Sequence, residues 1–171
     1  MRIVSYIILG IIILVFFTHL NFYSTHIDLI DYPLRAFYHA NIAHLAANAI
    51  SFYSLSFLEN AMGSAQFLLA MVFIWIFSSI ILYAIHKIFP SRKKYTVGFS
   101  GVIFGLIVIY FFLLNKSAGI TTIGLIISIL PQILAPGISF EGHLSGIIAG
   151  FLYVLFFHKK LIKFDIKSYL K

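Results

Sequence analysis

The residues of this chain best suited to chemistry are a serine and a histidine near the starts of two apolar segments. Ser100 lies in the sequence GFSG at 98–101, and His143 begins the pattern HxxGxxxG at 143–150. A serine hydroxyl becomes a nucleophile when a nearby base removes its proton, and histidine commonly provides that base. The pair predicts an enzyme that cuts peptide bonds inside a membrane, with Ser100 as nucleophile and His143 as general base.

Three more polar side chains lie in an earlier apolar segment. His44 and Asn48 are four residues apart and would share one face of a helix, with His39 about one turn before them. The oxyanion formed during peptide cleavage needs hydrogen-bond donors. His44, Asn48 and the backbone N–H of Ser100 at a helix N-terminus would supply them. The alternative for each side chain is a hydrogen bond that only bridges two helices.

Glycines recur along the two catalytic segments at the spacing of a helix face. Such small residues let helix backbones approach closely, so the helices that begin near Ser100 and His143 are expected to touch. An aromatic residue one turn after the serine is expected to lie beneath the imidazole. The supporting candidates are His39, Gly98, Gly101, Phe104, Gly146 and Gly150.

No carboxylate is placed to complete a serine–histidine–aspartate triad. The acidic residues lie outside the apolar segments or at their edges: Asp28, Asp31, Glu59, Glu141 and Asp165. We therefore expect a serine–histidine dyad. No metal or other cofactor is expected, because the chain has no cysteine, lacks the HExxH pattern of zinc proteases and spaces His39 and His44 five residues apart.

The composition places these residues in a membrane protein. Of 171 residues, 61% are hydrophobic and 10% are charged, and the mean hydropathy is +1.04. The formal net charge is +7, but the basic residues lie outside the apolar segments. They are interpreted as anchors at the membrane surface, so the lipid bilayer is an expected partner and nucleic acid is not.

Six apolar segments predict an all-α polytopic membrane protein with one domain over residues 1–171. The expected helices cover approximately 3–20, 36–58, 67–89, 97–115, 118–135 and 141–158. An even number of spans puts both termini on one side, and the lysine-rich tail predicts the cytoplasmic side of the cell membrane. The basic loop at 87–94 would then lie outside, against that rule. With six spans, the second, fourth and sixth helices run in one direction, so the polar candidates should share one depth.

The ordered motifs resemble those of the rhomboid family of intramembrane serine proteases. They are His39-x4-His44-x3-Asn48, Glu59-x3-Gly63, Gly98-x-Ser100-Gly101 and His143-x2-Gly146-x3-Gly150. The resemblance implies a six-transmembrane-helix bundle whose active site opens to the non-cytoplasmic side, and substrates that are transmembrane helices of other proteins. It implies the same roles for Ser100, His143, His44 and Asn48. Two departures are Leu34 before Arg35, where the family has a tryptophan, and Phe104, where the family often has tyrosine.

Other functions fit the sequence less well. A catalytically inactive rhomboid-like protein that binds membrane clients usually lacks the serine, the histidine or the flanking motif, and this chain keeps all three. A proton-coupled transporter would need an acidic residue in mid-membrane or an inverted repeat, and neither is visible.

Overall fold

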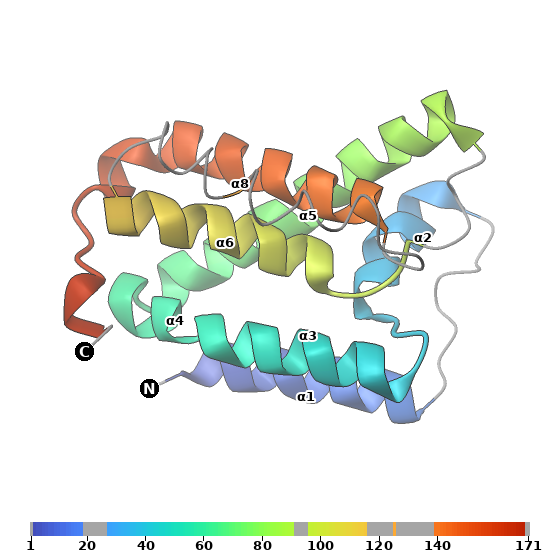
Figure 1. Ribbon diagram of the computed structural model, residues 1–171, viewed down its shortest axis with the longest axis horizontal. Helices are drawn as coiled ribbons and strands as arrows, with labels where there is room; N and C mark the ends of the chain where they lie inside the picture. Colours follow the sequence, from blue (N-terminus) through green and yellow to red (C-terminus); the bar gives the residue numbers. More distant parts are fainter. Residues whose placement is uncertain (1, 19–26, 91–95, 116–124, 126–138, 170–171) are drawn as a thin grey trace.

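The computed structural model describes residues 2–18, 27–90, 96–115, 125 and 139–169, and every element in those ranges is helical (Figure 1). The elements are α1 (Ile3–Phe17), α2 (Asp28–Leu34), η2 (Arg35–Phe37), α3 (Ile42–Leu55), α4 (Phe57–Met62), α5 (Ser64–Ile88), α6 (Ser100–Asn115), α8 (Phe140–Leu161) and η5 (Lys167–Tyr169). The expected helix over 118–135 lies outside the described residues.

The long helices are arranged so that three of them begin at one end of the molecule. In Figure 1, α3, α6 and α8 all start at the right and run to the left, whereas α1 and α5 run the opposite way. α6 packs along α8, α5 contacts both, and α1 packs against α3. η5 and the start of α1 are both at the left of this view. The polar candidates at the starts of α3, α6 and α8 are thereby gathered at the other end.

The surface of this helical assembly suits a membrane. α5 and α8 are long and apolar enough to cross a bilayer, and α1 and α6 are apolar but shorter. Large apolar side chains on the outer faces are strongly exposed, among them Leu14 at 62% and Leu155 at 72%. Apolar surface of this extent is typical of contact with lipid or with another protein.

The structure corrects several expected helix boundaries, most of all that of the segment 36–58. A single helix does not run through it, because the side chain of Asn41 accepts a hydrogen bond from the backbone N–H of His44 at 2.8 Å and caps a helix that begins at Ile42. His39 therefore lies before α3 and not on it. α6 begins at Ser100 rather than 97, and α5 begins at Ser64 rather than 67.

The glycines of α6 and α8 bring two helix backbones into direct contact. A Cβ atom at Gly146 would overlap the backbone carbonyl of Gly101, and one at Gly150 would lie 2.6 Å from the carbonyl oxygen of Gly105. No larger residue fits at these crossings unless the helices separate. This contact, called the α6–α8 seam below, sets the distance between the two helices that begin with the catalytic candidates.

At the opposite end of the molecule, a buried carboxylate joins three helices through hydrogen bonds. Glu59 is 1% exposed. It accepts hydrogen bonds from the backbone N–H groups of Val4 and Ser5, both at 2.9 Å, and from the hydroxyls of Ser5 and Ser64, both at 2.7 Å. The α1 N–H groups have no partner inside their own helix, so Glu59 satisfies them and joins α1, α4 and α5. Burial raises the pKa of Glu59, but the hydrogen bonds outweigh burial and hold the pKa below its ordinary value.

Replacing Glu59 by glutamine should lower the melting temperature in detergent, because each hydrogen bond to a charged group is worth about 1.5–3 kcal/mol. The folded-state pKa is lowered, so the stabilisation is complete above the unfolded pKa of about 4.3 and is lost as the pH falls through the folded value. The melting temperatures of wild type and Glu59→Gln should therefore converge in acid. Asp165→Asn, which removes the same charge at an exposed position, is the control. A melting-temperature difference independent of pH would contradict this assignment.

Candidate active site

Ser100 and His143 meet at the starts of α6 and α8. Nε2 of His143 lies 2.9 Å from Oγ of Ser100, which is hydrogen-bond distance. Ser100 is the first residue of α6, so its backbone N–H has no partner within the helix. The imidazole is 8% exposed, and Ser100 is half-buried. A hydroxyl beside a shielded imidazole nitrogen is the geometry that a serine nucleophile and its base require.

The turn before Ser100 depends on glycine at position 98. Gly98 has φ +106°, a conformation that L side chains rarely adopt. Its N–H donates to the backbone carbonyl of Arg35 at 2.9 Å, which fastens the turn to η2. The next residue, Phe99, is buried with its ring edge against Phe52. These contacts leave Ser100 at the tip of an anchored turn.

His44 and Asn48 of α3 approach the same turn. A Cβ atom at Gly98 would lie 2.6 Å from Nε2 of His44 and 3.6 Å from Nδ2 of Asn48, so both nitrogens point at the backbone beside Ser100. Asn48 donates one N–H to the carbonyl of its own helix at His44, at 3.0 Å, and has a second N–H. The two side-chain nitrogens therefore lie beside the turn that leads to Ser100.

His39 is placed behind His44 rather than at the serine. Its ring is 2% exposed and lies edge-on to that of His44, with ring centroids 5.2 Å apart. Nδ1 of His39 lies 3.2 Å from the carbonyl oxygen of Phe37 and would donate to it. His39 therefore supports the position of His44.

The imidazole of His143 is held by an aromatic ring and by the start of its helix. The ring of Phe104 stacks on it, with centroids 4.3 Å apart and an interplanar angle of 28°. The backbone N–H of His143 donates to the carbonyl of Ser139 at 3.3 Å. Ser139 is also the N-cap of α8, because its hydroxyl accepts from the N–H of Gly142 at 3.2 Å. The orientation of the imidazole thus depends on α6 and on the cap of α8.

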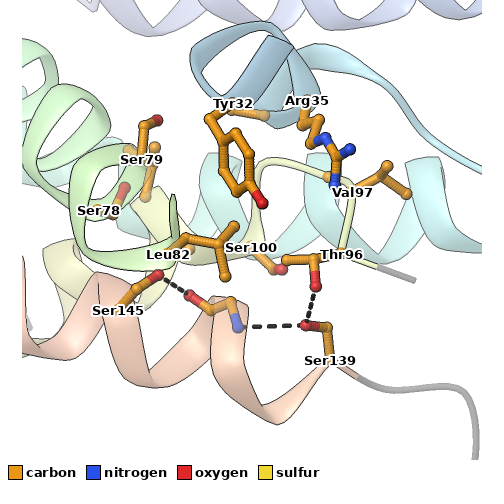
Figure 2. Close-up of a pocket in the computed structure, with 15 residues that line it drawn as sticks. Tyr32, Arg35, Ser78, Ser79, Leu82, Thr96, Val97, Ser100, Ser139 and Ser145 are labelled. Atoms are coloured by element: carbon orange, nitrogen blue, oxygen red, sulfur yellow. Dashed lines mark hydrogen bonds between the residues drawn. The ribbon is translucent and has the colours of Figure 1, made fainter. Parts of the chain in front are cut away.

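A small cavity of about 40 Å³ lies beside Ser100, between α2, α5 and α8 (Figure 2). Seven of its fifteen lining residues carry a hydroxyl group: Tyr32, Ser78, Ser79, Thr96, Ser100, Ser139 and Ser145. Sequence reasoning missed this lining, and with it Thr96 and Ser139. The sequence contained one feature that could have identified these two residues: Thr96 and Ser139 each stand four residues before a catalytic candidate. Within the described ranges, no group of three histidine or acidic side chains could hold a metal ion.

Comparison with known proteins agrees with the motifs. Residues 28–160 match the rhomboid domain family. A protein of Acanthamoeba polyphaga mimivirus, whose name places it provisionally among rhomboid proteins, is 57% identical over 157 residues, which are 92% of this chain and 92% of that protein. Rhomboid-like protein 14, mitochondrial, of Arabidopsis thaliana is 35% identical over 150 residues. An uncharacterized protein of Mycobacterium bovis is 32% identical over 127 residues.

The matches differ in extent. The Arabidopsis match covers 75% of this chain but 43% of the plant protein, and the Mycobacterium match covers 66% of this chain and 52% of its relative. The rhomboid-domain match includes every candidate residue, from His39 to Gly150. On this match and the identity to the viral protein, the chain belongs to the rhomboid family.

Proposed function

We propose that the chain is an intramembrane serine endopeptidase in which Ser100 and His143 form the catalytic dyad. The observation that carries the proposal is the 2.9 Å separation between Oγ of Ser100 and Nε2 of His143. Membership of the rhomboid family supports it, since the motifs that resemble those of the proteases of that family include both residues. The substrates would be transmembrane or membrane-proximal segments of other membrane proteins.

The reaction would proceed through an acyl-enzyme. Oγ of Ser100 attacks the carbonyl carbon of the scissile bond while its proton passes to Nε2 of His143. The C–N bond then breaks as His143 returns this proton to the leaving amine, and the new carboxyl terminus stays esterified to Ser100. In the second half, His143 takes a proton from water, the resulting hydroxide attacks the ester, and Ser100 regains its proton as the C–O bond breaks.

Three donors are proposed for the oxyanion: the N–H of Ser100, Nδ2 of Asn48 and a ring N–H of His44. Their support is geometric, because both side-chain nitrogens lie close to Gly98, two residues before the serine. Donors fixed before the reaction stabilise the developing charge without having to reorganise. No cofactor is needed for this chemistry.

The proposal extends to the arrangement in the membrane. We place six transmembrane helices in the chain, the fifth of them over 118–135, with both termini in the cytoplasm of a plasma-membrane protein. The exposed lysines at the end of α8 and in the following tail support this orientation. The dyad, at the opposite end of the bundle, would then open to the non-cytoplasmic side.

The alternative is a rhomboid-like protein that binds membrane clients without cutting them. Such a protein would have no need for a serine within hydrogen-bond distance of a histidine. It would still bind a transmembrane segment, so binding alone does not separate the two functions and cleavage does.

Ser100→Ala and His143→Ala should each reduce cleavage of a transmembrane reporter to background, because each removes a partner in proton transfer. The double variant should be no worse than either single variant, since members of one catalytic unit are not additive. The measurement is product formed by the purified protein in liposomes. Ser54→Ala is the matched control, because Ser54 donates only locally, to the carbonyl of Ile50 on the exposed side of α3. Turnover by either single variant would refute the dyad, and reporter binding without cleavage by the wild type would favour the client-binding alternative.

Asn48→Ala should lower kcat by about 10²–10³, the usual cost of one oxyanion donor, with little change in KM. Ser100 should still react with a fluorophosphonate probe, but more slowly. Asn115→Ala is the control, because Asn115 makes the same bond to the carbonyl four residues earlier, at the far end of α6. Equal effects of the two substitutions on kcat would show that Asn48 only braces its helix.

Cysteines introduced at two exposed positions should report the orientation. Ala40 precedes α3 at the dyad end of the molecule, and Ser168 lies in η5 at the other end. In intact cells, an impermeant thiol reagent should label Ala40→Cys directly and Ser168→Cys only after permeabilisation. The native chain has no cysteine, so labelling has no background. The reverse pattern would place the dyad on the cytoplasmic side.

A further inference from the structure

Two hydroxyl groups that precede the members of the dyad in sequence are themselves hydrogen-bonded to each other. Thr96 stands four residues before Ser100, and Ser139 stands four residues before His143. Their oxygen atoms lie 2.9 Å apart, a hydrogen bond that is visible in Figure 2. Thr96 is 6% exposed and Ser139 is half-buried, so this bond is partly shielded from solvent. The turn that leads to the nucleophile is therefore bonded directly to the cap of the helix that bears the base.

The α6–α8 seam does not fix the dyad by itself. Contact between glycine backbones sets how closely two helices approach, but it has little direction along the helix axes. Ser100 and His143 stand in the first turns of their helices, where a small shift along the axis would change the distance between Oγ and Nε2. A hydrogen bond between Thr96 and Ser139 is directional and lies beside these first turns.

The bond belongs to a longer chain of polar groups. Tyr32 Oη lies 2.9 Å from Nδ1 of His86, and Nε2 of His86 lies 3.4 Å from Oγ1 of Thr96. At the other end, Ser139 Oγ donates to Oε2 of Glu141 at 3.5 Å. Because the carboxylate only accepts, one consistent direction runs from the Tyr32 hydroxyl through the His86 ring, Thr96 and Ser139 to Glu141. Groups donating in one direction strengthen each other, so this chain joins α2, α5, the turn before α6 and α8.

We propose that Thr96 and Ser139 are positioning residues for the dyad. Their hydrogen bond sets the register of the starts of α6 and α8, and so the separation of Ser100 Oγ and His143 Nε2. His86 supports Thr96 from α5. This inference rests on the proposed function of Ser100 and His143.

The test uses substitutions that remove the hydroxyls and keep the shape or the cap. Thr96→Val exchanges the hydroxyl for a methyl group of similar size, and Ser139→Gly keeps a residue that is tolerated at an N-cap. Each should lower kcat by about 10- to 100-fold, the scale expected for misplacing a catalytic group by up to 1 Å, with KM unchanged. Labelling of Ser100 by a fluorophosphonate should slow in parallel. Thr96→Ser should restore both rates.

Two further variants make the result specific. Combining Thr96→Val with Ser139→Gly should lower kcat by less than the product of the two separate effects, because both changes break the bond between these two hydroxyls. Ser79→Ala is the control: Ser79 lines the same cavity, but its hydroxyl donates to the carbonyl of Trp75 in its own helix at 2.7 Å. It should leave kcat unchanged.

The outcomes separate this inference from the proposed function. If the wild type cleaves the reporter and Thr96→Val keeps the wild-type kcat, the positioning role is wrong and the dyad stands. If the effects of the two substitutions multiply, or if Thr96→Val lowers only the melting temperature, the bond is structural and the inference is also wrong. If the wild type cleaves no better than Ser100→Ala, the proposed function fails and the positioning role fails with it.

Discussion

The backbone contact between α6 and α8 is the constraint on which the site depends. Inside a bilayer, apolar side chains gain little by leaving lipid for another helix, so close van der Waals contact must supply the attraction. Gly146 and Gly150 permit that contact, since each places α8 where a Cβ atom would meet the α6 backbone. Only helices this close allow two short side chains, 43 residues apart in sequence, to lie 2.9 Å from each other.

Polar groups complete this arrangement at both ends of the molecule. Glu59 gathers donors from α1 and α5 at one end, and Thr96 and Ser139 join the turn before α6 to α8 at the other. A polar group buried in an apolar surrounding costs free energy unless it is hydrogen-bonded, so such groups are stable only when their partners are in place. The apolar seam thus brings the helices together, and the polar contacts determine how they are aligned.

The sequence predicted that Ser100 and His143 lie close together better than it predicted the backbone around them. Glycine spacing and the ordered motifs were enough to place Ser100 and His143 at the starts of neighbouring helices. The start of α3 was predicted wrongly, because apolar content does not reveal that the side chain of Asn41 caps the helix at Ile42. α2 was not predicted, because its seven residues include Pro33 and two aspartates, and such residues are typical of a loop. Its position depends on tertiary contacts, such as the bond from Trp75 to the Pro33 carbonyl at 2.8 Å.

Several residues around Ser100 lower the stability of the fold. Gly98 adopts a positive φ and leaves the space of a Cβ atom to the ring of His44, and glycine loses more conformational entropy on folding than any other residue. Asn48 and His143 are buried polar side chains at positions where apolar ones would pack more cheaply. A protein that only binds membrane helices would gain stability by losing these features. Unfavourable choices concentrated around one serine are typical of a site arranged for chemistry, which is consistent with the function proposed for Ser100.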